Sequence, residues 1–397
     1  MVAAVDHPPV TARTRRLLAF LLVPLLGAVV AGTVVLWPSG RPVTLAPSGT
    51  PIHATIVGLR RVTCADTAPA AGVRCLRAEA RLVTGGRVAL DERPDQPGTD
   101  LAVGDQVVVT KVGDTYALAG HRRDDPLAAV AGAAAIALLL VARRRGLFLL
   151  VALATTGGVL VAFAVPAVLD GRSPLAVGVV GGALVATAVL VLGRGVTARS
   201  ATALVGTLAG LAIAGGVGHL VVDAAHLAGL DATPGYLRVG RGAVPMDGLL
   251  LAGLVLGSVG ALVDLTIRQV DATWDLRATD PTAGWRGVAA AGRRRGGHDL
   301  ADVGATLVLA YAGAALPVLV LLAAGDQSVL DAVRGEVVAV EVVRALVGLL
   351  ALSAAVPVTA ALAAAIVVRE AGSTGSVDPR RFRSKAERDI WDLEDES

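Results

Sequence analysis

The chain has 397 residues, of which 54% are hydrophobic, and its mean hydropathy is +0.67. Soluble domains are about 45–50% apolar, and here the excess is gathered into runs of about 20 residues, the length of a helix that crosses a bilayer. The formal charge of +3 is small and the basic residues are spread over short flanks, which argues against a nucleic-acid-binding surface. The sequence therefore predicts an α-helical polytopic membrane protein whose partner is the lipid bilayer, with no nucleic acid.

The first apolar run follows a polar start that carries Arg13, Arg15 and Arg16. The run is longer than the hydrophobic part of a secretory signal peptide, and it ends at Trp37-Pro38 without a small-residue cleavage site. We therefore predict a cytoplasmic tail over residues 1–16 and a retained signal-anchor helix over residues 17–37.

Residues 38–125 form the one long polar segment of the chain. Apolar and polar residues alternate at 52–57 and 106–112, which predicts strands, and glycine-containing pairs between such stretches predict turns. We expect a small extracytoplasmic β domain, a barrel or sandwich of about five or six strands, inserted after the first helix.

The only two cysteines, Cys64 and Cys75, lie in this β segment. Their expected placement on neighbouring strands outside the membrane favours a disulfide over two free thiols. A zinc site is disfavoured, because two thiolates without nearby histidines cannot complete a tetrahedral set of ligands.

Seven further apolar runs complete about eight spans and form a helical bundle over residues 126–368. The runs lie at about 127–142, 147–169, 173–193, 201–225, 245–267, 303–324 and 342–368. Cytoplasmic loops retain positive charge, and the arginine-rich stretches at 143–145, 194–199 and 268–295 fall on one side with both ends of the chain. We therefore expect a plasma-membrane protein with both termini cytoplasmic, including a charged C-terminal tail over residues 369–397.

Glycines four residues apart recur within these runs and predict close packing of the helices. Small residues let helix backbones approach one another in lipid, where the hydrophobic effect does not drive association. The pairs are Gly178/Gly182, Gly206/Gly210 and Gly253/Gly257.

No nucleotide-binding lysine loop, nucleophile elbow or zinc-protease motif is present, so the sequence predicts neither an enzyme nor a cofactor. Polar residues near the sixth and seventh spans are the strongest remaining candidates. Asp264 is expected to end the sixth span at the cytoplasmic side. It either contacts an ion, a proton or a substrate there, or meets lipid headgroups while paired with Arg268. The candidate polar site comprises Asp264, Thr266, Gln269, Asp299 and Tyr311.

Two further groups have a chemical and a simpler interpretation. His219, Asp223 and His226 share one helical face and form a weak candidate for a divalent metal or a proton relay, but a helix end that turns polar at the water is preferred, and no metal is predicted. A basic loop with residues 293–295 and His298-Asp299 is expected to set topology rather than to grip a phosphate. Glu341 and Arg344 predict a local ion pair.

Three segments near the end of the chain resemble the YibE/F-like family of membrane proteins, in its actinobacterial form. They are DGLLLAGLVLGSVGALVDLTIRQVDATWDL (247–276), TLVLAYAGAALPVLVLL (306–322) and GEVVAVEVVRALVGLLALSAAVPVTAALAA (335–364). The resemblance implies a multi-pass membrane protein with a β domain after the first span, and it supplies no established catalytic or binding residues. The chain has Val263-Asp264 where the family has paired aspartates, and Ala305 where it has asparagine, so the resemblance implies a reduced polar site.

Together these features predict a permease-like or channel-like protein that moves a small solute or ion, with a cation or proton bound by Asp264. The alternative is a non-transporting envelope scaffold that presents its β domain to an extracytoplasmic protein partner. Convergence of Asp264, Asp299 and Tyr311 on one wet cavity would favour transport, and a tightly packed bundle centre would favour the scaffold.

Overall fold

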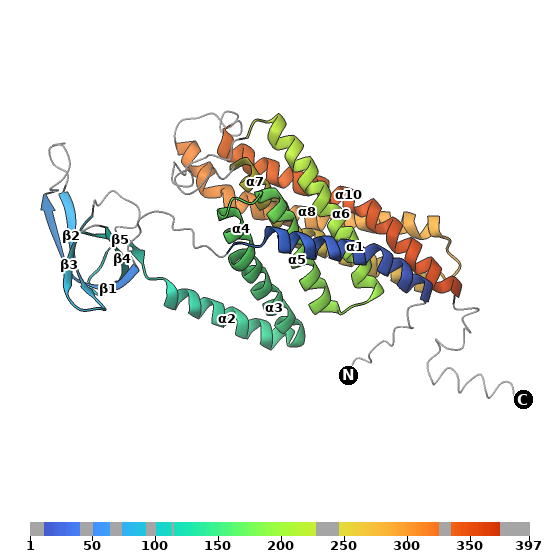
Figure 1. Cartoon of the computed structure of the whole chain (residues 1–397), viewed down its shortest axis with the longest axis horizontal. Helices are drawn as coiled ribbons and strands as arrows, with labels where there is room; N and C mark the ends of the chain where they lie inside the picture. The colour runs from blue at the N-terminus through green and yellow to red at the C-terminus, as the bar shows by residue number, and fades with distance from the viewer. Residues whose placement is uncertain are drawn as a thin grey trace, which may run out of the picture. The chain divides into compact units, whose positions relative to one another are not determined.

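The computed structural model describes residues 12–39, 51–63, 74–92, 101–112, 115–227, 246–324 and 335–373. These residues separate into two compact units (Figure 1). One unit contains the described residues between 40 and 150, which include all five strands. The other contains the first helix and the described residues from 151 onward. Most of both predicted tails, and Cys64 of the predicted disulfide, lie outside the described residues.

Five strands form one antiparallel sheet in the order β3-β2-β1-β4-β5. Their bounds are Pro51–Thr63 (β1), Arg74–Leu82 (β2), Arg87–Glu92 (β3), Gln106–Val112 (β4) and Thr115–His121 (β5). Irregular register at Ile56/Gly58 and at Val108/Val109 adds twist, and the edge strands β3 and β5 approach one another. The prediction of a small β domain is confirmed, and its form is a single curled sheet rather than a two-sheet sandwich.

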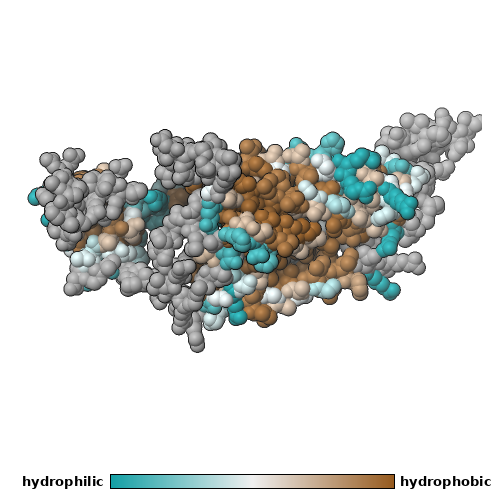
Figure 2. All heavy atoms as spheres, turned by 90° about the horizontal axis from the view of Figure 1, so that it is seen from above, coloured by the Kyte–Doolittle hydropathy of each residue, from teal (hydrophilic) through white to brown (hydrophobic). Residues whose placement is uncertain are grey.

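Within the described residues, eight helical segments are long and apolar enough to cross a membrane, as the sequence predicted. They are α1 (Ala12–Leu36), α2 (Asp124–Ala142), α3 (Arg144–Val159) continued by the π-helix η1 (Leu160–Ala164) and α4 (Val165–Leu169), α5 (Pro174–Arg194), α6 (Ala198–Ala224), α7 (Met246–Thr279), α8 (Trp285–Ala324) and α10 (Glu336–Ser373). In the bundle, α7 packs against α5, α6, α8 and α10. Figure 2 shows a broad hydrophobic surface over the middle of this bundle.

The helices that carry the predicted polar site are longer than their apolar runs, which corrects the sequence prediction. The helix that carries Asp264 does not end there, because α7 continues to Thr279. Residues 293–295 and His298-Asp299 do not form a loop, because they lie inside α8. With 34 residues, α7 is about 51 Å long, well beyond a hydrocarbon core of about 30 Å.

The extensions stay helical because charged residues alternate with buried ones at helical spacing. Thr273 on α7 and Val288, Ala289 and Gly292 on α8 are all buried. Val288 and Ala289 pack in a cluster that includes Val367 of α10. An amphipathic face thus continues the bundle where hydropathy alone predicts an end.

Glycines bring the helices of the bundle into close contact, as predicted. A Cβ on Gly178 of α5 would lie 2.7 Å from the Cα of Ala252 in α7. A Cβ on Gly210 of α6 would lie 2.5 Å from a methyl group of Leu262 in α7. At Gly178 the two helices therefore meet at a distance that a side chain would prevent, whereas at Gly210 the side chain of Leu262 would have to move.

One carboxylate ties the α5–α6 turn to α7. Asp271 of α7 lies 2.7 Å from Nη1 of Arg194, at the end of α5, and 3.5 Å from Nη1 of Arg199, at the start of α6. All three side chains are partly exposed, so solvent screens the attraction. This group marks one end of the bundle, called the arginine end below.

Asp271→Asn is expected to lower the free energy of unfolding by about 1 kcal/mol, because it leaves two guanidinium groups side by side without a carboxylate. Thermal unfolding of the purified protein at low and high salt measures the effect, which should shrink as salt screens the charges. Asp275→Asn, one turn further along α7, is the control, because Asp275 makes no ion pair within the described residues. An equal loss in both variants would contradict this role of Asp271.

Candidate functional site

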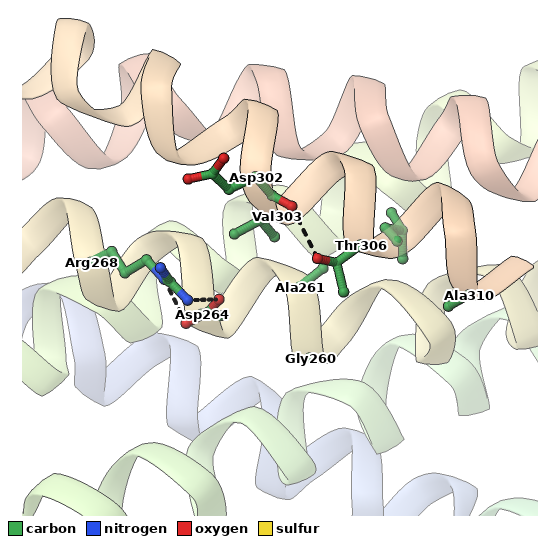
Figure 3. A pocket seen from close by; sticks show the side chains of 9 residues that line it. Gly260, Ala261, Asp264, Arg268, Asp302, Val303, Thr306 and Ala310 are labelled. Carbon is green, nitrogen blue, oxygen red and sulfur yellow. Dashed lines mark hydrogen bonds and ion pairs between the residues drawn. The ribbon is translucent and has the colours of Figure 1, made fainter.

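A groove of about 310 Å³ lies between α7 and α8 (Figure 3). Small and apolar residues form most of its walls, and three charged residues interrupt them. The lining residues are Gly260, Ala261, Asp264 and Arg268 of α7, and Asp302, Val303, Thr306, Leu307 and Ala310 of α8. The volume is near the lower end for ligand pockets, about 300 Å³, and it suits a hydrated ion or a very small solute.

On the α7 side of the groove, Asp264 and Arg268 form a two-point ion pair. Nε of Arg268 donates to Oδ1 of Asp264 at 2.9 Å, and Nη2 lies 2.9 Å from Oδ2. The two residues are four apart on the helix and therefore face each other. The predicted ion pair is confirmed, and it neutralises the charge of Asp264.

On the α8 side, Asp302 presents a carboxylate to the groove. Within the described residues the side chain of Asp302 makes neither a hydrogen bond nor an ion pair. Its negative charge acts at longer range on Arg268 across the groove. The hydroxyl of Thr306 donates to the backbone carbonyl of Asp302 at 3.0 Å, so its proton is used within α8. The groove therefore holds two carboxylates against one guanidinium.

Two residues of the predicted site, Thr266 and Gln269, point into the bundle and do not line the groove. Both are fully buried. The hydroxyl of Thr266 lies 2.9 Å from that of Thr207 in α6. Nε2 of Gln269 donates to the backbone carbonyls of Val356 in α10, at 2.7 Å, and of Gly292 in α8, at 3.3 Å. These side chains join α7 to its neighbours.

The other two members of the predicted site also lie away from the groove. Asp299 is 4% exposed, and its Oδ2 lies 3.4 Å from Nε of Arg295. Tyr311 is half-buried further along α8, and its hydroxyl lies against Gly257 of α7. Asp264, Asp299 and Tyr311 therefore do not converge on one cavity.

The predicted pair near the start of α10 is present. Nη1 of Arg344 donates to Oε1 of Glu341 at 2.5 Å. Both side chains are partly buried, at 28% and 23% exposed. The pair has the local role that its spacing predicted.

The weak metal candidate lies at an exposed helix end. His219 and Asp223 are exposed on α6, and His226 follows the helix with a φ of 51°. In the part of the chain that the structure describes, no three His, Cys, Asp or Glu side chains are grouped so that they could hold a metal ion. The geometry supports the simpler interpretation of a helix that turns polar at its end.

Sequence reasoning missed Asp302 and Thr306, although a usable signal was present. With Ala310 they recur every four residues and share one face of α8. The pattern becomes visible only when the helix is extended before residue 303, which the hydropathy of the segment does not suggest.

Comparison with known protein families identifies the family of this chain. A family model described as YibE/F-like protein matches residues 130–369, which include the groove and the buried polar side chains of the bundle. No curated protein and no solved structure matches the chain.

Proposed function

Since the chain belongs to the YibE/F-like family, we propose that it is a multi-pass membrane protein. From the groove between α7 and α8 we further propose that it moves a proton or a small cation across the plasma membrane. Asp264, Asp299 and Tyr311 do not converge, so the proposal rests instead on Asp264 and Asp302, which line one groove between α7 and α8. Among the described residues, the carboxylate of Asp302 has no hydrogen-bond or ion-pair partner. An ionisable residue beside lipid-type helices is costly and is usually retained for function. The proposal includes no catalytic activity and no cofactor.

The charge balance of the groove supports a cation as the moving species. Asp264 is paired with Arg268, whereas Asp302 remains available to bind a proton or a metal cation. Asp264 lies seven residues before Asp271, about 10 Å from the arginine end along α7. A cation at Asp302 would compete with Arg268 for Asp264, which gives the site two charge arrangements.

We further propose that the arginine end faces the cytoplasm, together with both termini. The support is the concentration of arginines at residues 194–199 and 293–295, since cytoplasmic segments retain positive charge. In this orientation the β sheet, which follows the first span, lies outside the cytoplasm.

Reconstitution in liposomes tests the function. The wild-type protein should carry protons, Na⁺ or K⁺ down a gradient faster than protein-free liposomes, followed with ion-sensitive dyes inside the vesicles. The double variant Asp264→Asn/Asp302→Asn removes both groove carboxylates and should return the rate to that of protein-free liposomes. Absence of protein-dependent flux for all three cations would overturn the proposal.

A second function, a non-transporting scaffold, is favoured by the packed bundle centre. Leucine, valine and alanine fill the core around Leu254, Leu262 and Leu352. The β sheet lies in a different compact unit from this core, and the alternative assigns its surface to an extracytoplasmic protein partner. A photo-crosslinker in place of the exposed Arg81 should then capture one specific envelope protein in cells. If repeated experiments capture no specific protein, this alternative is wrong.

A further inference from the structure

The curled sheet has the strand order of an OB fold, a five-stranded and partly open Greek-key barrel. Strand β4 returns beside β1 after β1, β2 and β3 have paired in sequence, and the approach of β3 to β5 makes the order around the curl β1-β2-β3-β5-β4. Strand β1 serves both halves of the curl, because residues 51–55 pair with β4 and residues 54–63 pair with β2. A bulge between Ile56 and Gly58 bends β1 where it changes partner.

The outer face of β2 and β3 is a common binding surface for oligonucleotides and oligosaccharides in OB folds. The fold alone does not assign a ligand, so the side chains on this face must decide which chemistry it suits. Ala78, Ala80 and Leu82 of β2 are buried inside the curl, so the residues that alternate with them face outward. The charged side chains on this outer face are Arg60 of β1, Arg77, Glu79 and Arg81 of β2, and Arg87 of β3.

Arginines lie opposite one another on this face. Arg60 pairs with Arg77 across β1 and β2, and Arg81 pairs with Arg87 across β2 and β3. Like charges directly opposite each other destabilise a pair of strands. Arg60, Arg81 and Arg87 are exposed, and none of these three makes an ion pair or a side-chain hydrogen bond within the described residues. An anion bound between the arginines would remove their repulsion.

The composition of the face favours an acidic sugar polymer as that anion. Four arginines outnumber two acidic residues there, Glu79 and Asp91, the second of which the register places opposite Arg77. Guanidinium groups bind carboxylates and phosphates through paired N–H donors. The residues of β1, β2 and β3 include no phenylalanine, tyrosine or tryptophan. The face therefore lacks the stacking platform of single-stranded nucleic-acid sites and the aromatic anchors of protein interfaces.

We propose that the outer face formed by Arg60, Arg77, Arg81 and Arg87, called the basic face below, binds an anionic polysaccharide of the cell envelope that carries carboxylate or phosphate groups. Arg77 and Arg81 are four residues apart on β2, so the two arginine pairs are separated by roughly 13 Å along the strand. Each pair would hold a different acidic group of an extended chain. The inference goes beyond transport and rests only on the proposed orientation, which places the sheet outside the cytoplasm.

Binding of labelled oligosaccharides to the purified full chain in detergent tests the basic face. The probes are oligogalacturonate for carboxylates, phosphomannan fragments for phosphates, and a maltooligosaccharide of similar length as the neutral control. One of the acidic probes should bind saturably, with an affinity that falls as salt rises, and the neutral probe should not bind. Arg81→Gln/Arg87→Gln should weaken binding by about tenfold, because it removes one of the two arginine pairs.

Lys111→Gln/Arg123→Gln is the matched control, because it removes the same charge from exposed positions outside the basic face. It should bind within about twofold of wild type. Glu79→Gln should bind about twofold more tightly or better, since it removes an acidic group from the face, and partial unfolding cannot produce such a gain. The basic face would be overturned by equal losses in the two double variants or by no saturable binding of either acidic probe. Equal binding of single-stranded DNA would overturn a polysaccharide as its ligand.

The orientation has a separate readout, because the chain has only two lysines, Lys111 in β4 and Lys385 near its C-terminus. An amine reagent that cannot enter cells should modify Lys111 in intact cells that express the protein, and should leave Lys385 unmodified. Modification of Lys385 alone would overturn the polysaccharide partner, since the sheet would then lie in the cytoplasm. Flux without polysaccharide binding would overturn the basic face alone, and binding without flux would overturn transport alone.

Discussion

Gly178→Leu is expected to lower the free energy of unfolding by roughly 3 kcal/mol or more, because it forces α5 away from α7. A Cβ at this position would lie 2.7 Å from the Cα of Ala252 and 3.1 Å from its carbonyl oxygen. Both are backbone atoms of a long helix, so no side chain can rotate to make room. The midpoint of thermal unfolding should fall by about 6–12 °C or more.

Gly216→Leu is the matched control for this prediction. Gly216 lies on α6, and a Cβ there would meet nothing within 4 Å. The control variant therefore adds the same side chain to an apolar helix without a clash, and it should unfold within about 2 °C of wild type. Equal losses in the two variants would show that the close contact of α5 with α7 is not a determinant of stability.

Asp302→Asn is expected to reduce cation flux about tenfold or more, because it removes the groove carboxylate that has no partner among the described residues. A loss of about 1.4 kcal/mol of stabilisation for the moving ion already corresponds to a tenfold change in rate. Asparagine keeps the size of the side chain, so the protein yield and the unfolding midpoint should stay near those of wild type. Flux into liposomes, normalised to reconstituted protein, provides the measurement.

Asp264→Asn offers a second arm of the same prediction. It leaves Arg268 without its ion-pair partner and free to occupy Asp302 across the groove, so flux should fall as well. Adding Arg268→Gln to Asp264→Asn removes the competing cation, and part of the flux should return. If Asp264→Asn and Arg268→Gln each lower the flux and their losses add in the double variant, Arg268 does not compete with the moving ion. Asp275→Asn should leave flux unchanged.

Hydropathy predicted the helical spans because each has an apolar stretch long enough to cross a bilayer. It failed at the ends of α7 and α8, where polar residues share the helix with a narrow buried face. Thr273 and Gly292 belong to that face, but neither is hydrophobic enough to mark it. These segments remain helical because they pack against α10, a helix that lies far from α7 in the sequence, and such packing can override local propensity.

The predicted polar site grouped residues that helical geometry separates. Asp264 and Gln269 are five apart, which places their side chains about 140° apart around α7, so one faces the groove and the other the interior. Asp299 and Tyr311 are twelve apart, about 18 Å along α8. Extending α7 and α8 as continuous helices would have suggested that Asp264 and the α8 face with Asp302 line the same groove.

Local ion pairs were the most predictable part of the site. Asp264 with Arg268 and Glu341 with Arg344 each stand one helical turn apart, and each pair is present. The role of Gln269 was not predictable, because its partners Gly292 and Val356 come from two other helices. Such contacts depend on how three helices pack, which the spacing within one segment does not determine.

The central claim is that the chain moves a proton or a small cation, and potential-driven flux tests it most directly. Wild-type protein is reconstituted in liposomes whose interior is made negative with a potassium gradient and valinomycin, and entry of Na⁺ and of protons is followed. The account predicts saturable entry of one of these cations with wild type, and entry at the protein-free rate with Asp264→Asn/Asp302→Asn. Wild-type entry at the protein-free rate for both cations and, in a parallel assay without valinomycin, for K⁺, or an equal rate in the double variant, would contradict it.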